Sequence, residues 1–216
     1  MASYESFLSR VMPHVIGAPE PLALQAISDA TIEFCEKSLI LQRDHDPVTV
    51  IANVVDYDLE PPTGYLVVKV MRAWLDNIKL NPAAPDFVAD AGVYNRLYSS
   101  YSAGPSTPRA YVQKDPRSIS LWPVADKKYA NGLTMRVALK PTRAAESVED
   151  EIYEDYVETI AAGAISRLML SPEKPYTNEK LAIFYGGKFT QGLNVARSRA
   201  LHGHSRSNLS VQLRKI

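Results

Sequence analysis

The stretch SVEDEIYEDYVETIAAGAISRLMLS (residues 147–171) has the apolar periodicity of a long α-helix. Its apolar stripe recurs at four-residue steps and consists of Ile152, Tyr156, Ile160, Ala164 and Leu168. Ser147 is placed to cap the first turn, with Asp150 three residues later as a variant of the capping box. Pro172 and Pro175 end the pattern. At 1.5 Å per residue, such a helix would be about 35 Å long.

A second long helix is predicted directly afterwards, in residues 177–203. Its interior contains Gly186, Gly187 and Gly192. Each glycine weakens a helix by up to about 1 kcal/mol relative to alanine, so we expect another helix to approach closely there. Gly203 is suited to end the helix. Residues 204–216 contain too few apolar side chains to build a core, and we expect an extended C-terminal arm.

Two more helices are predicted near the N-terminus, in residues 3–15 and 21–44. Ser3 is suited to cap the first helix, and Pro21 suits the first turn of the second. The second helix carries an apolar stripe of Ala23, Ile27, Ala30 and Phe34. Cys35 also lies in this helix, and we expect it to be buried because no basic neighbourhood would activate its thiol.

Between these helical segments the pattern is that of β-strands. Asp76 and Asn77 separate two apolar residues and predict a two-residue hairpin. Residues 85–102 predict a weaker helix. The predicted strands occupy residues 48–59, 64–75, 109–115, 118–125 and 133–140.

These elements predict an α+β fold. We expect a helical bundle of two N-terminal and two long C-terminal helices, an inserted small antiparallel β region, and an extended C-terminal arm. The predicted parts are a helical bundle domain in 1–46 and 141–203, an inserted β-rich domain in 47–140, and the arm in 204–216.

Composition excludes several functional classes. The 216 residues carry 24 Lys and Arg against 24 Asp and Glu, so the net charge suggests neither a nucleic-acid nor a membrane partner. Cys35 is the only cysteine, which excludes an intrachain disulfide. The sequence has no apolar run of membrane-spanning length and no signal-peptide pattern, so we expect a soluble protein made in the cytoplasm.

A catalytic or metal site is hard to assemble from this sequence. The segment YGGKF at 185–189 lacks the Ser or Thr that follows the lysine of a phosphate-binding loop, and it lies within a helical pattern. The pair His202 and His204, or the run Asp44–Asp46, would supply too few well-placed ligands. We therefore expect no enzyme activity, no cofactor and no metal.

The acidic residues Glu146, Asp150, Glu154 and Glu158 recur at four-residue steps. Acids near a helix N-terminus are favoured by the macrodipole, so a solvated face is one interpretation. Beyond the first turn, like charges at this spacing repel one another. The stripe therefore also suits a basic neighbour, or a channel that should not hold a polyanion.

The chain contains no Asp or Glu after Glu179, so its last part is basic. The arginines and lysine of the tail would suit phosphate binding, which leaves a nucleic-acid-binding protein as an alternative function. The tail has no aromatic side chain on which bases could stack. Instead, the apolar residues Leu209, Val211, Leu213 and Ile216 recur among polar ones, which is typical of a segment that adds a strand to a partner's sheet.

Residues 138–200 resemble the head-to-tail adaptor proteins of tailed bacteriophages, which are also called connector or gatekeeper proteins and include the tubular adaptors of short-tailed phages. The resemblance lies in the strand ending LKPTR, the helix with YVETIAAGAISRLM before a proline break, and the helix AIFYGGKFTQGLNVARSR. The first half matches more loosely, through ALQAISDATIEFCEKS and the turn YDLEPPTGY.

The resemblance implies a virion protein that forms a homo-oligomeric ring of about twelve copies under the portal protein. It implies a tail nozzle or other tail protein as a partner, and genomic DNA that passes through the lumen without sequence-specific binding. A head-completion or tail-terminator role is the related alternative. The expected portal-docking arm comprises Arg206, Leu209, Val211, Leu213, Arg214 and Ile216. The expected inter-subunit or lumen charges are Glu146, Asp150, Glu154, Glu158, Lys188, Arg197 and Arg199.

Overall fold

The computed structural model describes residues 1–84 and 105–203, which form two units. The helical unit consists of Met1–Leu41 and the described residues from Pro141 onward, and the β unit consists of the described residues in Gln42–Lys140. The described residues of the helical unit contain α1 (Glu5–Val11), the 3₁₀-helix η1 (Met12–His14), α2 (Glu20–Ser38), α4 (Asp150–Met169) and α5 (Glu179–His202), together with the short strands β1 (Ala2–Ser3) and β10 (Ser147–Val148).

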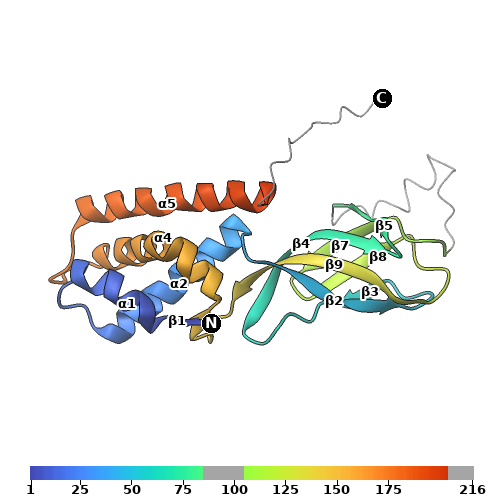
Figure 1. The fold of residues 1–216 in the computed structure, drawn as a ribbon, viewed down its shortest axis with the longest axis horizontal. Helices are drawn as coiled ribbons and strands as arrows, with labels where there is room; N and C mark the ends of the chain where they lie inside the picture. The colour runs from blue at the N-terminus through green and yellow to red at the C-terminus, as the bar shows by residue number, and fades with distance from the viewer. Residues whose placement is uncertain (85–104, 204–216) are drawn as a thin grey trace, which may run out of the picture. The chain divides into compact units, whose positions relative to one another are not determined.

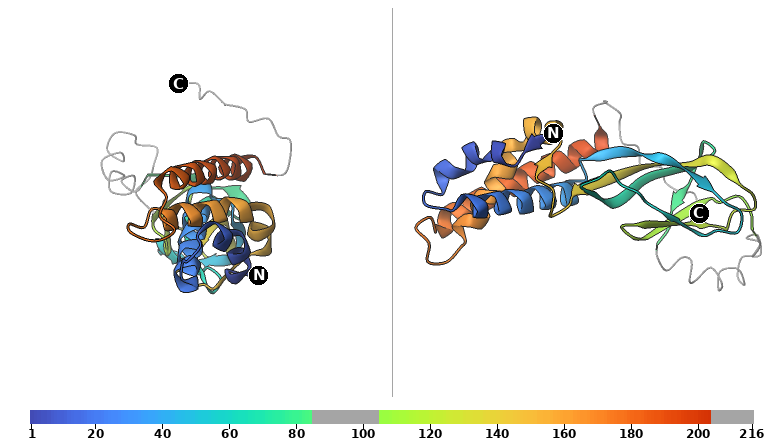
Figure 2. Two further views of the ribbon diagram at one scale, coloured as in Figure 1. Left: turned by 90° about the vertical axis from the view of Figure 1, so that its left-hand side faces the viewer. Right: turned by 90° about the horizontal axis from the view of Figure 1, so that it is seen from below.

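Helix α4 is the centre of the helical unit, because α1, α2 and α5 all pack against it (Figure 1). Figure 2 shows α5 on one side of α4 and α1 on another. Six consecutive residues of α4 are therefore buried, and most of them are small: Ile160, Ala161, Ala162, Gly163, Ala164 and Ile165. Phe34 of α2 joins the core through the rings of Tyr156, at 5.0 Å between centroids, and Phe189, at 6.4 Å.

The helix ends show which local signals operate. The side chain of Asn178 accepts a hydrogen bond from the Leu181 N–H at 3.1 Å and caps α5. Gly203 ends α5 as predicted, with φ 65° and its N–H bonded to Arg199. Helix α2 ends at Ser38, earlier than predicted, because Leu39 adopts a left-handed conformation with φ 56°. Ser147 does not cap α4, because it pairs with Ser3 in the β1–β10 sheet.

The described residues of the β unit contain two four-stranded sheets. One has the strand order β2 (Gln42–Val50), β9 (Tyr129–Pro141), β4 (Tyr65–Leu75), β5 (Ile78–Lys79), and the other has the order β3 (Asp56–Asp58), β8 (Ser118–Trp122), β7 (Ala110–Asp115), β6 (Asn81–Pro82). The predicted hairpin is confirmed, since Asp76 and Asn77 have φ values of 46° and 66° between β4 and β5.

Side-chain hydrogen bonds join the two sheets of the β unit, and strand β2 lies at the edge of one of them. Tyr111 donates a hydrogen bond to the Val70 carbonyl at 3.2 Å, and Gln113 accepts one from the Val70 N–H at 2.8 Å, so side chains of β7 bind the backbone of β4. Among the described residues, strand β2 is an edge strand that pairs only with β9. Its register shifts on both sides of Val48, next to Pro47.

The predicted fold class, a helical bundle with a small antiparallel β insertion, is wrong. The described residues contain three sheets, one of them inside the helical unit, and the protein is a mixed α+β structure. Strands β6 and β7 are parallel, with Asn81 opposite Ala110, so the β unit is not purely antiparallel either. Parallel strands require a long crossover, which no local turn signal reveals. The helix predicted in 85–102 lies outside the described residues.

Candidate functional site

The face formed by α4 and α5 collects most of the charged residues singled out in the sequence, and glycines determine how closely the two helices pack. A Cβ atom on Gly192 would lie 2.4 Å from Oγ1 of Thr159, and one on Gly163 would lie 2.7 Å from the Phe189 ring. Ser166 donates a hydrogen bond to the Ala182 carbonyl at 2.8 Å. The close approach expected at Gly192 is thus present, and the partner helix is α4.

A shallow groove of about 360 Å³ runs between the two helices. One side is acidic, with Asp155 and Glu158 of α4, and the other side carries Lys188 and Val195 of α5. Arg199 binds two residues of this lining, Asp155 at 2.7 Å and the hydroxyl of Tyr156 at 3.3 Å. The hydrogen bond with Tyr156 and the charge of Asp155 raise the pKa of Arg199 above its ordinary value. Arg199 therefore has a role within its own chain.

The acidic residues of the predicted stripe are exposed and differ in their surroundings. The backbone carbonyl of Glu146 accepts a hydrogen bond from the Tyr4 N–H at 3.1 Å. Asp150 binds the amino group of Met1 at 2.7 Å, and Glu158 lies 3.4 Å from Arg10. Glu154 has no ion-pair partner among the described residues. These contacts between exposed groups contribute little to stability, so the stripe remains accessible to a partner.

The basic residues of α5 are likewise on its surface. The Lys188 ammonium lies 4.9 Å from the centre of the Phe184 ring and 5.8 Å from that of Tyr185, a cation–π arrangement. Arg197 is exposed and has no ion-pair partner within the described part of the chain. The arm residues Arg206, Leu209, Val211, Leu213, Arg214 and Ile216 lie outside the described residues.

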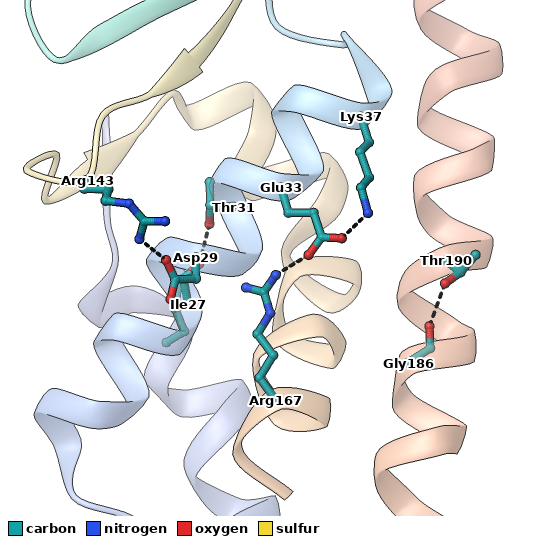
Figure 3. A network of polar contacts seen from close by, with 9 residues as sticks. All are labelled: Ile27, Asp29, Thr31, Glu33, Lys37, Arg143, Arg167, Gly186 and Thr190. Carbon is teal, nitrogen blue, oxygen red and sulfur yellow. Dashed lines mark hydrogen bonds and ion pairs between the residues drawn. The ribbon is translucent and has the colours of Figure 1, made fainter. Parts of the chain in front are cut away.

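A polar network fixes α2 against α4 and against the segment after β9 (Figure 3). Glu33 binds both Lys37 of its own helix and Arg167 of α4. Arg143 binds Asp29 at 2.7 Å. Burial raises the pKa of Glu33, but the hydrogen bond from Lys37 and the charge of Arg167 outweigh burial and lower this pKa below its ordinary value of 4.5. The network holds the scaffold on which the α4–α5 face is built.

A family model, that of the SU10 adaptor protein, matches residues 2–212. The chain belongs to the SU10 adaptor protein family. This membership agrees with the resemblance to phage head-to-tail adaptors, and the family is one of structural phage proteins found in the virion, not an enzyme family. A search of curated proteins found no match to the chain.

The structure also places the candidate metal ligands, apart from His204, which lies outside the described residues. Within residues 1–84 and 105–203, no group of three or more His, Cys, Asp and Glu side chains is placed to hold a metal ion. Both ring nitrogens of His45 contact backbone atoms, of Asp46 at 2.7 Å and of Glu60 at 3.0 Å. No helix in the described part of the adaptor is both long enough and apolar enough to cross a membrane.

Sequence patterns located the charged residues of the adaptor but not their partners. Asp155 and Tyr156 bind Arg199, and Glu33 binds Arg167, across separations of more than forty residues that local periodicity does not report. The exposed apolar residues of α5 were also missed. The sequence could have indicated them, because all five residues of LAIFY at 181–185 are apolar or aromatic, whereas a helix packed on one side needs apolar residues on that side only.

Proposed function

We propose that this adaptor forms a homo-oligomeric ring of about twelve copies beneath the portal protein, where it extends the DNA channel and provides a docking platform for tail components. The observation that carries the proposal is the family match over residues 2–212, which covers both units. In this proposal the α4–α5 face lies within the assembled head-to-tail junction, and the role is structural.

The charges of the helical unit support contacts between copies. A ring of identical chains needs two different surfaces that bind each other and close. Glu146, Asp150, Glu154 and Glu158 form an acidic surface, while Lys188 and Arg197 belong to a basic helix. Arg199 supports the ring indirectly, because its bond to Asp155 holds α5 on α4.

A lining of the DNA channel is the other role that suits the acidic stripe, because repulsion would keep DNA sliding. Changing Glu154→Lys together with Glu158→Lys separates the two roles. Loss of ring assembly assigns the stripe to the contact between copies, whereas normal rings with slowed DNA release assign it to the lumen. DNA passes without sequence-specific binding in either case.

The C-terminal arm is proposed to dock onto the portal by strand addition. Leu209, Val211, Leu213 and Ile216 would enter pockets of the partner, and Arg206 and Arg214 would contact its surface. Deletion of residues 204–216 should leave a folded, soluble adaptor that no longer binds portal rings in a co-sedimentation assay. An unfolded product, or one that binds normally, contradicts the proposed role of the arm.

Point variants sharpen the arm experiment because they keep its length. Replacing Leu209, Val211 and Leu213 by serine should abolish portal binding, since strand addition needs side chains that fill pockets. The matched variant Arg206→Gln with Arg214→Gln keeps the apolar pattern and should retain most binding. Greater damage from the arginine pair would show that charge, and not strand addition, attaches the arm.

The β unit is proposed to face the tail nozzle or another tail protein, because the helical unit holds the surfaces assigned to copies and portal. Cryo-electron microscopy of purified particles tests the whole proposal. A ring of this chain between portal and tail is the expected result. If the protein is absent from purified particles, the adaptor role is wrong for this chain.

A further inference from the structure

The side of α5 that faces away from α4 is unusually apolar. Five of the twelve large hydrophobic side chains exposed in the described chain lie on this one helix. Ile183 is 74% exposed, Phe184 54%, Val195 61% and Leu201 58%. A surface helix normally carries polar residues opposite its packed face. Figures 1 and 2 show no other helix of the helical unit covering this side. We call Ile183, Phe184, Gly187, Val195 and Leu201 the outer face of α5. Val195, at one edge of this face, also lines the groove between α4 and α5.

Gly187 adds an independent observation. Gly192 faces α4, where a Cβ atom would clash with Thr159, whereas a Cβ atom on Gly187 would meet nothing within 4 Å. Packing among the described residues therefore gives no reason for a glycine at position 187, in the interior of a helix that alanine would favour. A missing side chain in the middle of an exposed apolar face allows a second backbone to approach closely.

The charges around the outer face indicate what covers it. Lys180 and Arg197 are exposed and have no ion-pair partner among the described residues. The same chain carries opposite charge on another side of α4, where Asp150, Glu154 and Glu158 recur at four-residue steps and Glu154 also has no described partner. One molecule thus offers two surfaces of complementary charge, and each is exposed.

We propose that the outer face of α5 packs against the acidic face of α4, formed by Asp150, Glu154 and Glu158, on a second copy of this chain. Because the two surfaces are different, the contact is head-to-tail, and each copy still has one free surface for the next. The inference rests on the proposed function for closure into a ring. It names the helix surfaces through which neighbouring copies in that ring contact each other. It also assigns the acidic stripe to the contact between copies, not to the lumen.

Self-association of the full-length chain, measured by sedimentation over a wide concentration range, tests the contact. Phe184→Glu with Val195→Glu should weaken association about tenfold or more, because it places charge in an apolar contact. Ile16→Glu is the matched control, since Ile16 is 80% exposed and lies outside α5. A control that weakens association equally, or an α5 variant that associates normally, overturns the inference.

Charge reversal tests the head-to-tail geometry without touching the apolar residues. Glu154→Lys and Arg197→Glu should each weaken association. An equimolar mixture of the two variants should restore it, because one contact then brings the two reversed charges together and the next contact has both native residues. A mixture no better than either variant alone overturns the head-to-tail arrangement.

Zero-length carbodiimide cross-linking of mixed ¹⁵N-labelled and unlabelled chains captures contacts too weak for sedimentation. Cross-links between Lys180 or Lys188 of one copy and Glu154 or Glu158 of another are expected. Their absence at every concentration overturns the contact. Absence of the chain from purified particles would instead refute the proposed function, so the two failures are distinguishable.

Discussion

Replacing Gly192 by alanine should destabilise the helical unit, because α5 lies too close to α4 at this point for a methyl group. The new Cβ would lie 2.4 Å from Oγ1, 2.5 Å from Cγ2 and 3.0 Å from Cβ of Thr159. Overpacking of this kind costs about 1 to 3 kcal/mol. The gain in helix propensity returns about 1 kcal/mol. The expected result is a net loss of up to about 2 kcal/mol in the free energy of unfolding.

Urea denaturation followed by far-UV circular dichroism measures this loss, because every described helix belongs to the helical unit. Gly187→Ala is the matched control in the same helix. Its methyl group meets nothing within 4 Å, so the free energy of unfolding should rise by up to about 1 kcal/mol. Opposite signs for the same substitution, five residues apart, are the signature of the packing described above.

A second-site change tests the cause. Thr159→Ala removes the two nearest clashing atoms and should restore most of the stability lost in Gly192→Ala. The double variant should therefore lose less free energy of unfolding than the two single variants lose together. If Gly192→Ala stabilises the protein as Gly187→Ala does, the close contact between α4 and α5 at Thr159 is absent and the reasoning is refuted.

Three further results are expected. Glu33→Gln should lower the free energy of unfolding at neutral pH by about 1 to 3 kcal/mol, through weaker bonding to Lys37 and Arg167. Because the pKa of Glu33 is lowered on folding, the free energy of unfolding of the wild type should also fall as the pH drops below 4.5 toward the folded-state pKa. The variant should lose less stability over the same pH range. Denaturation curves at several pH values measure this difference. Burial raises the pKa of the Cys35 thiol to about 12, so the folded protein should not react with a thiol reagent until urea unfolds it; rapid native labelling would contradict this. Asn178→Ala should cost about 1 kcal/mol through loss of the α5 cap, with Asn178→Asp as the tolerated control in the same assay.

Local periodicity predicted which side chains of a segment lie on its buried face. The stripe of Ala23, Ile27, Ala30 and Phe34 is fully buried in α2, and Cys35 is buried beside it. The hairpin at Asp76 and Asn77 was predictable for the same reason, because a two-residue turn is encoded within the turn itself.

Pairing between distant segments was not predictable in this way. Ser3 and Ser147 pair in a sheet within the helical unit, and Asn81 pairs in parallel with Ala110, yet no local pattern distinguishes these residues from caps or loops. The end of α2 was missed because Leu39 is not a residue type that signals a left-handed conformation. These long-range contacts are why the fold class was wrong.

For the candidate site, too, local spacing predicted the positions of residues but not their long-range partners. The four-residue spacing located Asp150, Glu154 and Glu158 on the surface, and the glycines of α5 indicated a close helix contact. The partners that decide what each charge does come from elsewhere in the chain: Met1 for Asp150, Arg10 for Glu158 and Asp155 for Arg199. Which exposed charges lack such a partner is information that only the folded chain provides.

The edge strand β2 could pair with the same strand of another copy when copies are close together. An open edge strand can recruit the edge of another molecule, and a ring would hold many identical edges at high local concentration. Pro47 removes one backbone donor from this edge, the register shifts around Val48 distort it, and the neighbouring carboxylates of Asp44 and Asp46 repel their counterparts on another copy. In the proposed ring, these features oppose the pairing of sheets from neighbouring copies into an amyloid-like ladder.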